Sequence, residues 1–145
     1  MQNSRHGPVE ALCSMRLHVP QSQAYVSIAA FLHYSQQDPY AVRFRFWLDP
    51  VGDPVAWYIG RDLLRDGLLH LVGEGDVQIG PDHSLSAILI RLRVDEHSST
   101  MTVPRQPVAE FLQRTAKAVP YGYESQAPGF VDLRDAALER LSSEL

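Results

Sequence analysis

Apolar and polar residues alternate in two long segments near the start of the chain, 9–19 and 25–34. A period of two is typical of a β-strand that buries one face, so each segment predicts a strand. Residues 20–23, Pro-Gln-Ser-Gln, separate the two segments and are typical of a turn. We therefore expect these strands to pair antiparallel, because only a short connection joins them.

Alternation returns at residues 42–48, where arginines lie between apolar positions. This segment predicts a strand, for which we expect a central position in the sheet. Another strand is predicted at residues 55–59. Residues 61–66 follow with strong helix formers and predict a short helix that ends at Gly67. The arginines and aspartates that alternate in this helix predict solvated ion pairs.

The next part of the chain predicts three shorter strands, at residues 76–80, 85–94 and 100–103. The middle of the second one is apolar on both faces, so we expect it to lie under another element. Residues 95–99 are polar and predict a loop.

From Pro107 the spacing of apolar residues changes to that of a helix, and one stripe forms. Its members are Val108, Phe111, Leu112, Thr115, Ala116 and Val119. A last helix is predicted over residues 130–145, with Asp132 as its N-terminal cap. Its single apolar face must pack on this subunit or on another one. Residues 1–8 predict a disordered tail.

This order of elements predicts a single domain over residues 1–145. Seven predicted strands follow one another through short connections, with one short helix among them and two longer helices after them. Such an order favours an α+β fold built on an antiparallel, barrel-like sheet.

The composition is that of a folded globular domain with a mildly acidic balance. Apolar residues make up 45% and charged residues 21% of the chain, which indicates neither disorder nor a membrane protein. Thirteen basic against 17 acidic side chains give a net charge of -4, which disfavours general attraction to nucleic acid or acidic lipid. The apolar runs are too short to span a bilayer, and a single cysteine fits a reducing compartment. We therefore expect a cytoplasmic protein without a transmembrane segment.

No group of residues has the spacing of a known catalytic or metal-binding motif. Cys13 shares the apolar face of its strand, which indicates a small buried side chain. The six histidines are scattered, without the pairing that zinc sites need. Residues 73–76, Gly-Glu-Gly-Asp, lack the lysine and the helix of a phosphate-binding loop and predict a turn. We expect no enzymatic activity, no metal and no cofactor.

Two pairs of arginines favour an alternative function. Arg43 with Arg45, and Arg91 with Arg93, occupy alternate positions, so each pair would share one face of a strand. Together with aromatic neighbours such as Trp47, they would suit single-stranded nucleic acid. Arginines that only face solvent explain the pairs equally well. Because the whole chain is acidic, nucleic acid is the less favoured partner.

Four motifs appear in an order that matches a known protein family. They are D-P-Y-A-V-x-x-x-F at 38–46, W-Y-I-G-R-D-L-L-R-D-G-L at 57–68, G-E-G-D-V at 73–77 and F-L-Q-R-T-A-K-A-V-P-Y-G-Y-E at 111–124. By these motifs the chain resembles the SsgA-like family of actinobacterial sporulation and cell division proteins, and within it the SsgB group. The resemblance depends on the order and spacing of all the motifs together.

The resemblance implies a small non-enzymatic protein that helps to place or activate the division septum during sporulation. The implied partners are the tubulin-like division GTPase FtsZ and other family members, and the implied location is the septum. The implied fold is similar to that of the Whirly single-stranded nucleic-acid-binding proteins, assembled as a homotrimer. Exposed motif positions would then form a protein-interaction site: Asp38, Pro39, Tyr40, Arg61, Asp62 and the loop 119–124 with Gly122.

Two positions depart from the usual family pattern. Gly60 stands where the family commonly has alanine, and residues 94–99 replace a Ser-Pro-x-Gly turn. The second departure leaves the subgroup open. It also leaves open whether the protein recruits FtsZ directly or acts at another stage of septum formation.

Overall fold

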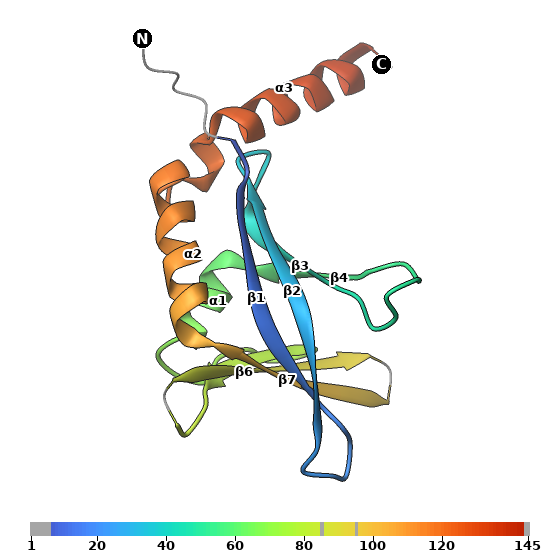
Figure 1. Cartoon of the computed structure of the whole chain (residues 1–145). Coiled ribbons are helices and arrows are strands. Elements are labelled where there is room, and N and C mark those ends of the chain that lie inside the picture. The colour runs from blue at the N-terminus through green and yellow to red at the C-terminus, as the bar shows by residue number, and fades with distance from the viewer. Residues whose placement is uncertain (1–6, 85, 95, 144–145) are drawn as a thin grey trace.

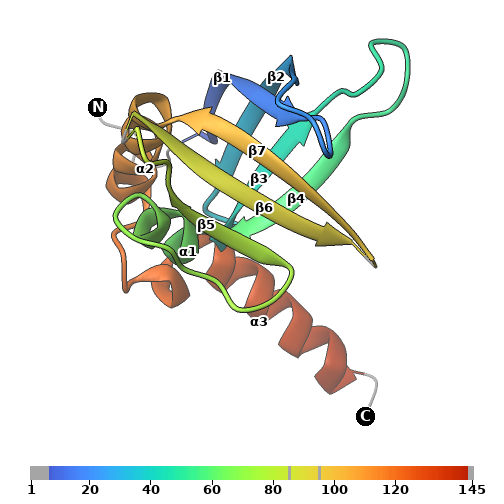
Figure 2. The same cartoon turned by 90° about the horizontal axis from the view of Figure 1, so that it is seen from below.

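The computed structural model describes residues 7–84, 86–94 and 96–143, and its strands form one seven-stranded antiparallel sheet (Figure 1). In pairing order they are β4 (Val55–Gly60), β3 (Asp38–Phe46), β2 (Tyr25–Ser35), β1 (Val9–His18), β7 (His97–Pro104), β6 (Ala87–Val94) and β5 (Val77–Pro81). Figure 2 shows how this sheet curls into a half-barrel. The predicted α+β fold with a barrel-like antiparallel sheet is confirmed.

The sheet bends where β1 meets β7. β1 pairs with β2 along its whole length, but with β7 only at Arg16 and Leu17. The long pairing follows from the matched alternation of the two strands, which buries one face of both. The short joint lets the two halves of the sheet turn towards each other, so that both present their inner faces to one core.

The inner face of the curled sheet holds the apolar core. Its side chains come from the apolar positions of the alternating segments and include Met15, Leu32, Phe44, Ile59, Ile90 and Met101. Helix α2 (Arg105–Ala118) closes this core with its apolar stripe. The short helix α1 (Arg61–Gly67) packs against β5, where a side chain at Gly67 would collide with Ile79. Both helices had been predicted from their spacing.

One prediction about strand position was wrong. The strand predicted at residues 42–48 was expected at the centre of the sheet, but β3 is second from the edge and β1 takes the middle. Alternation shows which face of a strand is buried. It carries no information about which neighbours pair with that strand.

The prediction of a polar loop at residues 95–99 was wrong for residues 97–99, whereas Glu96 does lie in a turn. Residue 95 lies outside the described residues, but β7 already starts at His97. Ser99 pairs with Leu92 of β6 in a tight hairpin. Backbone hydrogen bonds across this hairpin hold the segment in the sheet although its side chains are polar.

The C-terminal helix starts earlier than predicted. After one 3-10 turn, η1 (Glu124–Gln126), helix α3 runs over Pro128–Ser143, so Asp132 lies within the helix and not at its start. Proline suits the first turn of a helix, because its missing N–H would have no partner there. Residues 1–6 of the predicted tail, and residues 144–145 of the predicted helix, lie outside the described residues.

Candidate protein-interaction site

Arg61 lies at the centre of a buried cluster that joins segments far apart in the sequence. Its side chain is fully buried at the start of α1. Nη1 donates hydrogen bonds to the carbonyl oxygens of Thr115 (3.2 Å) and Val119 (2.6 Å). Nη2 donates to Oε2 of Glu124 (3.0 Å). The start of α1 is thereby joined to the end of α2 and to η1. The prediction of Arg61 as an exposed, solvated residue was wrong.

Two tyrosine rings enclose the guanidinium group of Arg61. Its Cζ lies 4.1 Å from the centre of the Tyr121 ring and 4.9 Å from that of the Tyr34 ring. Arg65 stacks on Tyr121 as well, at 4.4 Å. Burial raises the pKa of both tyrosines, so both rings are neutral phenols at physiological pH. Neutral aromatic faces attract a desolvated cation, with about 2 kcal/mol for a favourable contact.

Glu124 is buried as an ion. Burial alone would raise the pKa of its carboxyl group, but hydrogen bonds from its own backbone N–H and from Arg61 hold that pKa below its ordinary value. Oε1 accepts a further hydrogen bond from the N–H of Gly122 (2.9 Å). Gly122 has a φ of 90°, which residues with a side chain rarely adopt. The ion pair therefore fixes the shape of the loop 119–124 as well as its position.

An open apolar groove of about 350 Å³ lies between α1 and α2, next to this cluster. Apolar side chains of α2 line it, together with Leu68 just after α1 and with Arg65, Arg105, Gln113 and Tyr121. Leu69, which follows α1, also lines the groove and has 73% of its surface exposed. The Arg61 cluster sets the geometry of the groove, because it holds α1, the end of α2 and Tyr121 together.

Two of the predicted interaction residues, Asp62 and Gly122, are exposed on this side of the molecule. Asp62 pairs with Arg65 at 3.8 Å, and Arg65 also pairs with Asp66 at 3.1 Å. These are the solvated ion pairs that the sequence predicted for α1. Neither residue lines the groove itself: Asp62 pairs with the lining residue Arg65, and Gly122 follows the lining residue Tyr121 in the chain.

The predicted residues Asp38, Pro39 and Tyr40 lie at the start of β3 and support α3. Asp38 and Tyr40 are exposed, but Pro39 is buried, so its expected exposure was wrong. The carbonyl oxygen of Pro39 accepts a hydrogen bond from the hydroxyl of Tyr34 (3.0 Å). Tyr40 meets Phe130 of α3 edge to face, with ring centres 5.7 Å apart. This motif therefore anchors the start of α3 and reaches the Arg61 cluster through Tyr34.

The sequence held one signal for the buried cluster. A basic residue at the start of a helix is electrostatically unfavourable, because that end of the helix carries a partial positive charge. Arg61, as the first residue of α1, therefore needs another source of stabilisation. Its partner Glu124 could not be inferred, because 63 positions separate the two residues. Thr115 was correctly placed on the buried stripe of α2, but its carbonyl was not expected to bind Arg61.

The two arginine pairs proposed for nucleic acid lie apart. Arg43 and Arg45 lie on the outer face of β3, whereas Arg91 and Arg93 are exposed on β6. Three strands, β2, β1 and β7, separate β3 from β6 in the sheet. Inner side chains of β3 and β6 face the same small cavity in the core, so the outer faces of these strands point in opposite directions. The four arginines do not form one basic surface.

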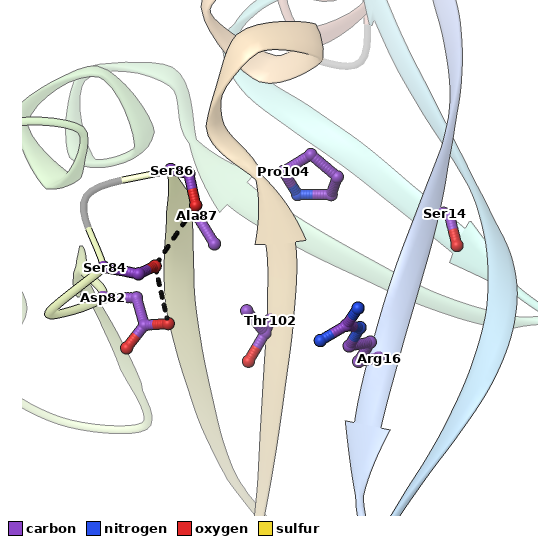
Figure 3. Close-up of a pocket in the computed structure, with 8 residues that line it drawn as sticks. All are labelled: Ser14, Arg16, Asp82, Ser84, Ser86, Ala87, Thr102 and Pro104. Atoms are coloured by element: carbon purple, nitrogen blue, oxygen red, sulfur yellow. Dashed lines mark hydrogen bonds between the residues drawn. The ribbon is translucent and has the colours of Figure 1, made fainter.

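A polar hollow of about 330 Å³ lies between β1, β7 and the turn after β5 (Figure 3). Its lining is rich in hydroxyl groups and includes Arg16 and Asp82. Oδ2 of Asp82 accepts a hydrogen bond from Ser84 (3.3 Å), and its Oδ1 contacts His83 (2.9 Å). The aspartate thus separates the histidine from the serine, so His83 is not placed to take the serine proton. These side chains do not form a hydrolytic triad.

The single cysteine is part of the apolar core. Cys13 is buried, and burial raises the pKa of its thiol to about 11, so it is protonated at neutral pH. Within the described residues, no three histidine, cysteine, aspartate or glutamate side chains gather where they could hold a metal ion. In the same part of the chain, no helix has the length and apolar character needed to cross a membrane.

Comparison with known sequences identifies one family. The family described as "Streptomyces sporulation and cell division protein, SsgA" matches residues 28–124. The sporulation-specific cell division protein SsgB of Frankia casuarinae is 38% identical, over 94% of this chain and 93% of its own length. SsgB of Thermobifida fusca is 36% identical, over 88% of this chain and 91% of its own length.

Two solved structures share the fold. The crystal structure of an SsgA-like sporulation-specific cell division protein from Thermobifida fusca has a TM-score of 0.81 at 32% identity, over 97% of this chain and 99% of that one. The second structure comes from work relating mutations in SsgB to longitudinal cell division during sporulation of Streptomyces coelicolor. It has a TM-score of 0.77 at 33% identity, over 83% of this chain and 95% of that one.

Proposed function

This chain belongs to the SsgA family of sporulation and cell division proteins, and we propose that it acts in sporulation-specific septum formation as a non-enzymatic interaction module. Among its relatives, SsgB proteins match most of its length. In this proposal it binds FtsZ and other family members at the septum, as a homotrimer. It would place or activate the septum through the surface it presents and not through a chemical step.

One observation carries the proposal: the groove between α1 and α2 is firmly built and lined mainly by apolar side chains. The motif at 57–68 and the motif at 111–124 both contribute to its lining. They meet there because the buried pair of Arg61 and Glu124 joins them. The buried ion pair thus holds the two segments in place, and the groove between α1 and α2 exposes apolar side chains to a partner. This arrangement supports recognition of another protein, for example of the apolar face of a helix.

Co-sedimentation with FtsZ polymers tests the direct form of the proposal. We expect the wild-type protein to pellet with the polymers. Leu69→Glu should weaken that binding roughly 10-fold or more, because it places a charge in an apolar contact. Leu71→Glu is the matched control, since Leu71 is also a leucine with 70% exposure but is not part of the groove lining. Absence of wild-type pelleting, or equal loss in both variants, would contradict direct binding.

The division role is tested in cells. A fluorescent fusion of the protein should gather at sporulation septa, and a strain that lacks the gene should form fewer or misplaced septa. A diffuse fusion together with normal septation in the deletion strain would refute the role. This assay does not depend on which partner the groove binds.

Single-stranded nucleic acid is the alternative partner, and one contact favours it. Cζ of Arg45 lies 5.6 Å from the ring centre of Trp47, so the outer face of β3 combines a cation with an aromatic ring. Titration of a labelled oligonucleotide at low salt decides between the two. Binding that falls with salt and weakens in Arg43→Ala would support this alternative. A flat titration would exclude it.

A further inference from the structure

The polar hollow beside β1 forms where two strands stop pairing. β1 pairs with β7 at Arg16 and Thr102, and the same register would next place Ser14 opposite Pro104. Proline has no N–H to donate to a sheet, so the pairing ends at this position. Ser14 and Pro104 line the hollow from the two strands (Figure 3). The hollow therefore results from the sheet itself and not from the shape of a single loop.

A cation and an anion lie on opposite sides of the polar hollow. Arg16 extends from β1 and Asp82 follows β5, while Thr102 of β7 lies between them (Figure 3). β7 and β6 separate β1 from β5 in the sheet, and three strand spacings place the two backbones roughly 14 Å apart. Among the described residues, Arg16 forms no ion pair with Asp82 or with any other carboxylate. Each charge therefore remains available to a ligand.

Neighbouring groups orient both charges and leave them able to bind. The guanidinium group of Arg16 stacks on the Tyr25 ring, with Cζ 4.6 Å from the ring centre, and stacking leaves its N–H groups free at the edge. Oδ1 of Asp82 accepts a hydrogen bond from the backbone N–H of His83 (2.8 Å), and Oδ2 accepts one from the Ser84 hydroxyl (3.3 Å). The His83 ring also contacts Oδ1, but it is 98% exposed and can turn into solvent. Because a carboxylate has about four acceptor sites, Asp82 can accept further hydrogen bonds.

Hydroxyl groups line much of the space between the two charges. They belong to Ser14, Ser84, Ser86 and Thr102, and the last of these contacts Nε2 of His18 at 2.6 Å. A hydroxyl can donate and accept, so this lining suits a polar ligand. The volume of about 330 Å³ is near the lower end of the range of small-molecule sites, roughly 300–1,000 Å³. A fitting ligand is therefore small and polar, with opposite charges at its two ends.

We propose that the polar hollow binds a short peptide of two or three residues with both termini free. The C-terminal carboxylate of the peptide pairs with Arg16, and its N-terminal ammonium group pairs with Asp82. An extended chain spans about 3.3 Å per residue, so two or three residues bridge much of the space between the two charged side chains. The hollow shares no lining residue with the groove between α1 and α2, so this inference goes beyond the proposed function.

Titration of the isotope-labelled full chain with triglycine, followed by NMR, tests the site. We expect amide resonances of residues that line the hollow to shift at millimolar peptide. Triglycine with a C-terminal amide, and triglycine with an N-terminal acetyl group, should each bind roughly 5-fold or more weakly, because each lacks one of the two ion pairs. This comparison uses the wild type alone, so it is decisive even if a variant fails to fold.

Two variants identify which side chain holds which end of the peptide. Arg16→Gln should bind triglycine and its C-terminal amide equally well, but should still prefer triglycine to the acetylated form. Asp82→Asn should show the opposite pattern. Arg91→Gln is the matched control, because Arg91 is an exposed arginine that pairs with Thr100 on β7 but does not line the hollow. It should keep both preferences.

Three results would overturn the proposal: a flat titration of the wild type, blocked peptides that bind as well as triglycine, or a variant that keeps the preference it should lose. Resonance shifts spread over the whole domain would also overturn it, since they would show binding without a site. None of these results affects co-sedimentation with FtsZ polymers or the septation assay. Failure of the peptide site and failure of the division role are therefore distinguishable.

Discussion

The substitution Arg61→Met removes the charge at the centre of the buried cluster and keeps much of the apolar stem. Its hydrogen bonds to Thr115, Val119 and Glu124 are lost. The carboxylate of Glu124, 5% exposed, is left without its partner in the core. Removing one member of a buried ion pair costs about 3–5 kcal/mol, mainly because the other charge stays desolvated.

This loss is large compared with the free energy of unfolding of an ordinary domain, which is about 5–15 kcal/mol. The hydrogen bonds and the stacking on Tyr34 and Tyr121 act on the same guanidinium group, so their separate energies overlap and are not added to the estimate. In a domain of this size each kcal/mol lowers the melting temperature by about 3 °C. We therefore expect Arg61→Met to melt roughly 10–15 °C below the wild type.

Urea unfolding followed by circular dichroism measures this loss, with Arg65→Met as the matched control. Arg65 pairs with Asp62 and Asp66 at the surface, and such exposed pairs contribute about 0–1 kcal/mol. Glu124→Gln should lower the free energy of unfolding by less in the Arg61→Met variant than in the wild type. In that variant the carboxylate that the change removes has already lost its partner. A loss below about 1 kcal/mol for Arg61→Met, or one equal to that of Arg65→Met, would refute the role assigned to the cluster.

Three further results are expected. Glu124 has a lower pKa in the fold than in the unfolded chain, so its stabilisation is complete above about pH 4.3 and is lost as the pH falls through the folded value. The unfolding free energy of Glu124→Gln should accordingly vary less with acid pH, and an unchanged pH profile would contradict this. Gly122→Val should cost roughly 1–2 kcal/mol in urea unfolding, because valine is strained at a φ of 90°, and full stability would speak against that strain. Gly67→Ala should lower the free energy of unfolding by roughly 1–3 kcal/mol in thermal unfolding, because its Cβ would collide with Cγ2 of Ile79. Gly60→Ala, at the other end of α1, should raise it by about 0.4–1 kcal/mol. Equal effects of the two changes would show that the structure relieves the collision at Gly67.

Local patterns in the sequence determined most of the secondary structure. Alternation at residues 9–19 and 25–34 is compatible with strands that bury one face, and the stripe that begins at Val108 is compatible with an amphipathic helix. Short connections between successive strands then favoured an antiparallel sheet. The family could be identified for a similar reason, because its motifs are continuous stretches of sequence whose order is visible without a structure.

The tertiary structure decided which distant residues meet, because a contact between remote segments leaves no local period in the sequence. The next residue after Arg61, Asp62, does lie at the surface, and only the packing of α1 against α2 and η1 places Glu124 beside Arg61. The polar start of β7 is a strand because β6 lies alongside it, not because of its own side chains. The groove beside Tyr121 arises in the same way, since it is assembled from elements that only the fold brings together.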